Sequence, residues 1–160
     1  MNEEKLQYLL DRQSIRDVLL RNAIAFDDAD FTGLDDIWVP DCRRDDGEGR
    51  GTPIEDREEL RRRLTASAAK FRWTHHQLGD SLIDIDGDTA KSMTFVACWH
   101  ELLDGEQCWA TARYYDEFRR DDDGRWRITL RRLIMTGAEG SLNDHGGNWL
   151  VRQLPASSLS

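Results

Sequence analysis

The residue best suited to acid–base chemistry near the N-terminus is Asp27, at the end of a predicted helix. A helix turns ~100° per residue, so Asp27 shares a face with Leu20, Ala23 and Ile24, whereas Asp28 falls on the polar side. A carboxylate that points inward needs a cation or a proton donor, because losing its water costs several kcal/mol. Asp27 is therefore a candidate catalytic residue, and a helix-end aspartate in solvent is the alternative.

Two adjacent histidines, His75 and His76, lie in the segment 73–78, which has the pattern of a strand. Neighbouring strand residues face opposite sides, so the pair is poorly placed to share one metal ion, and we predict no metal site. One of the two must face the interior. It is either a histidine bonded to the backbone or a general base, oriented by a carboxylate that accepts its Nδ1 proton.

The N-terminal part of the chain, which would position Asp27, is predicted to be helical. Apolar residues recur every three or four positions through the first third of the chain, which predicts a helix ending at residue 28 with a break near residue 13. We expect a short helix over 31–38, a charged Gly-rich loop over 43–51, and then an amphipathic helix whose apolar side includes Leu60 and Leu64.

After residue 70 the pattern changes to strands. Helices followed by a long antiparallel series of strands predict one α+β domain over 1–160, with a core over 6–136 and a C-terminal tail over 137–160. Both faces of one strand are apolar, which favours a homo-oligomer. The predicted strands span 73–78, 81–86, 91–103, 107–119 and 125–136. We expect an apolar trio in the tail to dock on the body or a neighbouring chain: Trp149, Leu150 and Val151.

The composition of the chain limits the classes of molecule that it is expected to bind. The chain has 160 residues, of which 39% are hydrophobic and 33% charged, and its net charge of −9 argues against nucleic acid and anionic membranes. No basic leader and no run of ~20 apolar residues is visible. Cys42, Cys98 and Cys108 fit neither a disulfide framework nor a zinc site, which favours a cytoplasmic protein with reduced thiols. Without a nucleotide-binding motif, we expect no cofactor.

Six short segments resemble, in their order, the SnoaL-like branch of the nuclear-transport-factor-2-like superfamily. This branch includes scytalone dehydratase, bile-acid 7α-dehydratase and hexachlorocyclohexane dehydrochlorinase. The resemblance implies a cystatin-like, cone-shaped α+β barrel, in which a curved antiparallel sheet wraps around N-terminal helices and encloses a cavity. The segments are 25–27, 34–38, 74–80, 86–90, 112–116 and 123–128.

The same resemblance implies an Asp–His dyad inside the cavity. Asp27 matches the dyad aspartate, and His76, the third residue of a T-x-H pattern, matches the dyad histidine in preference to His75. It also implies a cavity arginine, Arg131, for which a surface partner of nearby acids is the alternative.

Further residues are predicted to contact the substrate. Asn22 stands where the dehydrochlorinase has a cation, which argues against halide abstraction, and Phe26 replaces a tyrosine of scytalone dehydratase. If Phe95 and Trp99 face the cavity, strand alternation points His100 outward. The whole predicted set is Asn22, Phe26, Trp38, Phe95, Trp99, His100 and Tyr114. For its aromatic members, an ordinary core position is the alternative.

The implied activity is that of a cofactor-independent lyase or isomerase, of the dehydratase or cyclase type, acting on a hydrophobic, ring-containing small molecule. His76 would remove a proton, Asp27 would hold His76, and Arg131 or Tyr114 would stabilise developing negative charge. Elimination of water is the preferred reaction. The alternative is a non-catalytic protein that binds a hydrophobic ligand or resembles an oxygenase small subunit. Because members of the family it resembles are dimers or trimers, we expect a homo-oligomer, either a dimer or a trimer.

Overall fold

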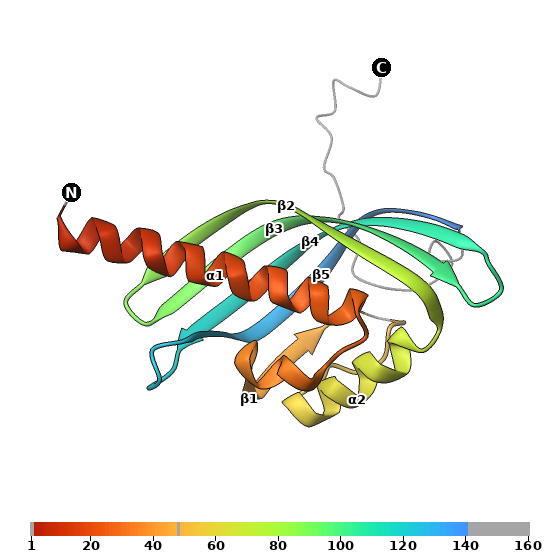
Figure 1. Ribbon diagram of the computed structural model, residues 1–160, viewed down its shortest axis with the longest axis horizontal. Coiled ribbons are helices and arrows are strands. Elements are labelled where there is room, and N and C mark those ends of the chain that lie inside the picture. The colour runs from red at the N-terminus through yellow and green to blue at the C-terminus, as the bar shows by residue number, and fades with distance from the viewer. Residues whose placement is uncertain (1, 48, 141–160) are drawn as a thin grey trace, which may run out of the picture.

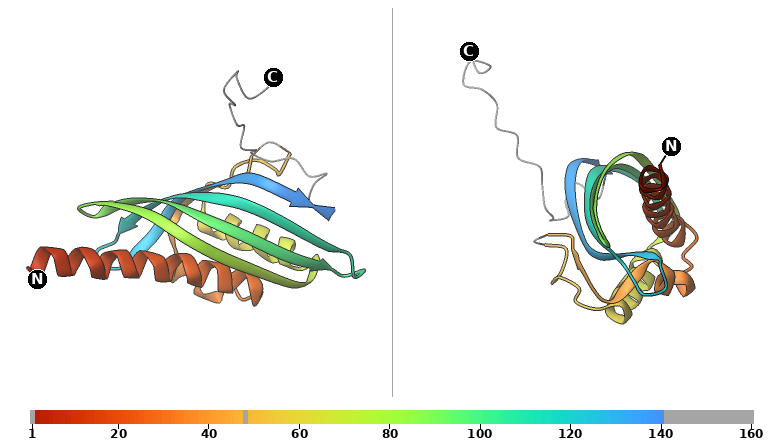
Figure 2. Two further views of the ribbon diagram at one scale, coloured as in Figure 1. Left: turned by 90° about the horizontal axis from the view of Figure 1, so that it is seen from above. Right: turned by 90° about the vertical axis from the view of Figure 1, so that its left-hand side faces the viewer.

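The computed structural model describes residues 2–47 and 49–140. A curved sheet wraps around one long helix, and two shorter helices pack beside the C-terminal end of that helix (Figures 1 and 2). None of the described helices has the length and apolarity needed to cross a bilayer. The helices are α1 (Glu3–Asp27), the 3-10 helix η1 (Thr32–Asp36) and α2 (Arg57–Ala68). The strands are β1 (Trp38–Asp45), β2 (Phe71–Asp86), β3 (Thr89–Leu102), β4 (Gln107–Arg120) and β5 (Trp126–Glu139).

The predicted α+β fold, with a curved sheet around the N-terminal helices, is confirmed. The strand order is β1-β5-β4-β3-β2, and β2 to β5 form the predicted antiparallel series. Two details differ from the prediction. β1 runs parallel to β5, so the sheet is mixed, and within the described residues β1 and β2 remain its two open edges instead of closing a barrel.

β1 was missed in the sequence, because residues 31–38 were predicted as helix and 43–51 as loop. The helical part ends at Asp36, and the chain then forms a strand in which Trp38, Val39 and Cys42 are buried. Pro40 has no N–H to donate, but β1 is an edge strand, where proline is tolerated.

The predicted break in the first helix is also wrong, since α1 is continuous over 25 residues. At the position of the predicted break, the side chain of Gln13 donates a hydrogen bond of 2.8 Å to Asp17, one turn later. Such pairs four residues apart stabilise a helix and do not interrupt it. The true start is capped by Asn2, whose side chain accepts from the backbone N–H of Lys5 at 3.0 Å.

β2 is one strand over 71–86 where two were predicted. Its pairing with β3 shifts between Leu78 and Ser81, which marks a bulge, and a bulge bends a strand without ending it. Gly79 lies in the bulge, and a Cβ added there would come within 3.2 Å of the Cβ of Phe95. The glycine therefore lets two strands approach closely where the sheet curves.

The core has two parts with different residue sizes. The larger part packs α1, η1 and α2 against the sheet, with Leu19, Leu34 and Trp38 among its members. The smaller part lies on the concave face of β3 to β5 and contains several small side chains, including Cys98 and Ala110. Small residues on a curved face leave open space, and this space is the site described next. The apolar trio at 149–151 lies outside the described residues.

Candidate active site

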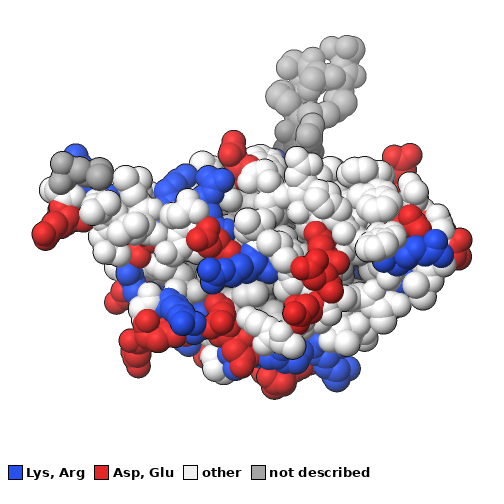
Figure 3. Space-filling model, in the orientation of Figure 1, with Lys and Arg blue, Asp and Glu red and all other residues white. Residues whose placement is uncertain are grey.

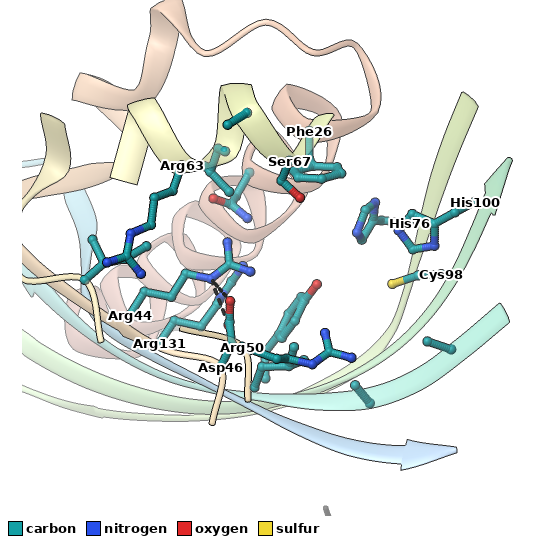
Figure 4. A pocket seen from close by; sticks show the side chains of 18 of the residues that line it. Phe26, Arg44, Asp46, Arg50, Arg63, Ser67, His76, Cys98, His100 and Arg131 are labelled. Carbon is teal, nitrogen blue, oxygen red and sulfur yellow. Dashed lines mark hydrogen bonds and ion pairs between the residues drawn. The ribbon is translucent and has the colours of Figure 1, made fainter. Parts of the chain in front are cut away.

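A cavity of about 540 Å³ lies between the concave face of the sheet, α1, α2 and the segment after β1. Its volume is in the range of pockets that hold a small organic ligand. The lining changes in character from one side to the other (Figure 4), with histidines and a cysteine facing a group of arginines. The sheet contributes Arg44, Phe71, His76, Cys98, His100, Ala110, Ala112, Tyr114, Arg131, Leu133 and Met135.

Asp27 and His76 meet in this cavity. The Nδ1 atom of His76 lies 2.6 Å from Oδ1 of Asp27, and the backbone N–H of His76 donates to Oδ2 at 2.8 Å. The hydroxyl of Thr74 donates to Oδ1 at 2.8 Å. Because Nδ1 carries the proton shared with the carboxylate, Nε2 is left as the basic nitrogen, and it has no hydrogen-bond partner among the described residues. The ring is thus held in the tautomer that a general base requires.

The position of Asp27 at the last residue of α1 is electrostatically costly by itself. The carboxyl end of a helix carries partial negative charge, and α1 has no basic residue in its last turn. Partial burial also favours the protonated acid, but the hydrogen bonds from the ring and backbone of His76 and from Thr74 outweigh it. The pKa of Asp27 is therefore lowered below its ordinary value. The three donors keep the carboxylate ionised beside the imidazole.

His100 faces the cavity beside the dyad. Its ring centroid lies 5.5 Å from that of His76 and 4.7 Å from that of Phe71, and its Nδ1 is buried without a hydrogen-bond partner in the described part of the chain. Burial, reinforced by the nearby His76, lowers the pKa of His100 to about 4. His100 is consequently a neutral imidazole near neutral pH.

The predicted strand phase that placed Phe95 and Trp99 in the cavity is wrong. His76 pairs with Cys98 across β2 and β3, and residues paired in this way face the same side, so the even-numbered residues of β3 face inward. Phe95 is 48% exposed, and neither it nor Trp99 lines the cavity. The largest apolar side chains of β3, Phe95 and Trp99, lie on its outward face, and the inward face carries smaller ones such as Val96 and Cys98, so side-chain hydrophobicity indicated the wrong face.

Arg131 lies in the cavity wall, as the resemblance implied, and the alternative of a surface position is wrong. It is 2% exposed, and its guanidinium carbon lies 4.0 Å from the ring centroid of Tyr114. Its Nε and Nη2 donate to the two oxygens of Asp116 at 2.7 and 3.0 Å. Burial raises the pKa of Tyr114, so its phenol keeps its proton and can act as a donor.

The remaining predicted contacts divide between the wall and the layer behind it. Asn22 and Phe26 line the cavity, and the ring of Phe26 meets that of His76 edge-on at 5.2 Å. Trp38 is completely buried and does not line the cavity; its indole N–H donates to Oδ1 of Asn22 at 2.8 Å. Trp38 therefore orients a wall residue from behind.

Sequence reasoning missed the polar wall opposite the dyad, which includes Arg44, Asp46, Arg50 and Arg63. The first three fall in the segment predicted as a charged loop. If β1 had been recognised, alternation from the buried Cys42 would have placed Arg44 on the inner face. Among the described residues, no three His, Cys, Asp or Glu side chains are grouped so as to hold a metal ion.

Comparison with known proteins identifies related chains. The model of the SnoaL-like domain matches residues 7–132. An uncharacterized protein of Mycobacterium tuberculosis (strain ATCC 25618 / H37Rv) is 32% identical over 126 residues, which are 76% of this chain and 82% of the relative.

Solved structures with the same fold include two whose names refer to enzymes. A putative scytalone dehydratase from Novosphingobium aromaticivorans has a TM-score of 0.81 at 19% identity, covering 92% of this chain and 97% of that one. A type 2 hexachlorocyclohexane dehydrochlorinase has a TM-score of 0.75 at 22% identity, covering 84% of this chain and 91% of that one. At these identities the likeness shows the fold.

Proposed function

Because the chain belongs to the SnoaL-like domain family, we propose that it is a cofactor-independent lyase or isomerase, with His76 as general base and Asp27 as its partner. The observation that carries the proposal is the 2.6 Å contact between Nδ1 of His76 and Oδ1 of Asp27 at the wall of a ligand-sized cavity. A histidine packed only for stability does not need its second nitrogen to face open space.

Elimination of water is the reaction that these groups support best. Nε2 of His76 takes a proton from the carbon next to a carbonyl, the electrons of that C–H bond form a C=C bond, and the C–O bond at the next carbon breaks. The departing hydroxide takes the proton from the imidazolium of His76 and leaves as water, which returns His76 to its neutral form. Asp27 stabilises the imidazolium that forms.

Two neighbouring side chains of β4 and β5 are available to stabilise the developing negative charge. The phenol of Tyr114 is a proton donor, and Arg131 is a fixed cation stacked on its ring. The apolar part of the lining, which includes Phe26, Leu133 and Met135, suits a hydrophobic ring.

The test is hydrogen exchange with solvent, because it detects proton removal before the natural substrate is known. Ring ketones, with and without a β-hydroxyl group, are incubated in D₂O, and deuterium at the α-carbon is measured by mass spectrometry. Loss of water is followed by the absorbance of the conjugated product. We expect His76→Ala to reduce both rates by about 10²- to 10⁴-fold.

His75→Ala is the matched control, since this neighbour is exposed and does not line the cavity. It should retain the rates of the unmodified protein. If tight-binding ring compounds exchange no faster than in buffer, or if His76→Ala is as active as His75→Ala, the proposal fails. The first outcome would indicate a ligand-binding protein without catalysis.

A further inference from the structure

The charge of the cavity wall is opposite to that of the whole chain. The described lining residues include six cationic side chains and one carboxylate, Asp46, although the chain carries a net charge of −9. On the outer face shown in Figure 3, acidic and basic side chains are interspersed. The six cations of the wall are Arg44, Arg50, Arg62, Arg63, Lys70 and Arg131.

Two of these arginines are adjacent by strand register. Arg44 on β1 and Arg131 on β5 are paired in the parallel ladder, so the two side chains leave the same face of the sheet next to each other. Two neighbouring cations repel one another, and each here has its own carboxylate. Asp46 accepts from Nε of Arg44 at 2.9 and 3.0 Å, and Asp116 accepts from Nε and Nη2 of Arg131 at 2.7 and 3.0 Å.

These ion pairs leave donors unused. Arg44 donates only through Nε, so its Nη1 and Nη2 have no acceptor within the described part of the chain, and neither nitrogen is sealed from solvent. Arg131 likewise keeps Nη1. The two end nitrogens of a guanidinium form a fork that matches the two oxygens of a carboxylate. Figure 4 shows Arg44 and Arg131 together across the cavity from His76.

We propose that the substrate of this site is a ring-containing carboxylic acid, whose carboxylate binds end-on to Nη1 and Nη2 of Arg44, beside Nη1 of Arg131, while its ring extends to His76. The inference rests on the function proposed for the dyad and adds the class of its substrate. The two flanking carboxylates, Asp46 and Asp116, suit a monoanion better than a phosphate dianion, because each repels additional negative charge.

The exposed cations at the cavity rim fit the same ligand. Arg62 and Lys70 are exposed, whereas Arg44 is mostly buried. Cations that line the entrance raise the local concentration of an anion, and a partly desolvated arginine then binds it more strongly than it would in water.

Binding of a matched pair of probes tests the inference without turnover. Naphthoate and naphthamide have nearly the same shape and differ in charge, and their dissociation constants are measured by calorimetry at neutral pH. We expect naphthoate to bind at least about tenfold more tightly. Arg44→Gln should weaken naphthoate binding by about 10- to 100-fold and leave naphthamide binding almost unchanged.

Arg43→Gln is the control, because Arg43 precedes Arg44 on β1, is 55% exposed at its side chain, and does not line the cavity. It should bind both probes as the unmodified protein does. Arg44→Lys, which keeps the charge but loses the fork, should give an intermediate affinity for naphthoate. If Arg44→Gln fails to fold, the ratio of the two affinities in the unmodified protein still decides.

Equal affinity for naphthoate and naphthamide overturns the inference. The inference also fails if naphthyl phosphate binds more than about tenfold more tightly than naphthoate, because a phosphate would then be the preferred group. The outcome is independent of the dyad. If the protein catalyses hydrogen exchange but binds naphthoate no better than naphthamide, only this inference is rejected. If it prefers naphthoate but catalyses no exchange, only the proposed catalysis is rejected.

Discussion

The carboxylate of Asp27 accepts hydrogen bonds from both the ring and the backbone N–H of His76, at 2.6 and 2.8 Å. One side chain therefore joins the last residue of α1 to β2, an edge strand of the sheet. The ring is positioned by two elements that are distant in sequence, and its orientation depends on the integrity of both.

Asp27→Asn should lower the rate of proton removal by about 10²- to 10⁴-fold, because an amide lacks the charge that stabilises the imidazolium and presents an N–H₂ group to one of the donors. The rate is measured as deuterium incorporation into a ring ketone. Asp28→Asn is the control, since Asp28 is the exposed neighbour. Equal rates in the two variants would contradict the role of Asp27.

Asp27 should also make stability depend on pH in the acid range. Its pKa is lower in the folded protein than its ordinary value of 3.8, since three hydrogen bonds outweigh partial burial. The unfolded chain therefore binds a proton at a pH at which the folded chain does not. The contribution to stability is fully present above the ordinary pKa and is lost as the pH falls through the folded pKa.

The measurement is urea unfolding at several values between pH 6 and pH 3. The unmodified protein should lose more stability over this interval than Asp27→Asn, which has no proton to bind at this position. Parallel loss in the two proteins would show that the hydrogen bonds to Asp27 do not lower its pKa.

The α+β class and the antiparallel series of strands could be predicted from the sequence, because they depend on the order of helical and alternating patterns. The family was indicated by the resemblance of six short segments. Helix phase directed Asp27 inward, and the hydrogen-bonded contact with His76 agrees with that direction. Of the residues expected to share its buried face, however, only Ala23 is buried, whereas Leu20 and Ile24 are 50% and 47% exposed. β1 could not be predicted, since Pro40 and the charged residues after Cys42 resemble a loop. Its place depends on pairing with β5, which is distant in sequence.

Three features of the site lay beyond sequence patterns. The inward face of β3 follows from its register with β2. His100 belonged to the predicted set, but the assumption that Phe95 and Trp99 face the cavity would have pointed it outward, whereas it lines the cavity. The partner of Arg131 is Asp116, on the neighbouring strand. The arginine wall required the same unrecognised strand that carries Arg44. In each case a contact between segments distant in sequence decides the position.

His100 should remain neutral well below the pH at which an exposed histidine takes up a proton. Burial and the nearby His76 lower its pKa from 6.5 to about 4, so the unfolded chain binds a proton that the folded chain rejects. The contribution of neutral His100 to folding stability is present above its ordinary pKa of 6.5 and is lost as the pH falls through about 4. Nitrogen NMR of the imidazole, assigned with His100→Gln, reports its protonation directly. A protonated His100 signal at pH 5.5 would contradict the prediction.

Arg131 and Asp116 form a buried ion pair, with side chains that are 2% and 0% exposed. Removing one partner leaves an uncompensated charge in the interior, and Asp116→Ala should therefore cost about 3–5 kcal/mol of unfolding free energy, measured by urea denaturation. Replacing both residues, as in Arg131→Met with Asp116→Leu, should recover much of this loss because no buried charge remains. The exposed pair of Lys91 and Glu117 serves as the control, and its loss should cost at most about 1 kcal/mol. A double variant less stable than Asp116→Ala would instead indicate that the interior is arranged around this pair.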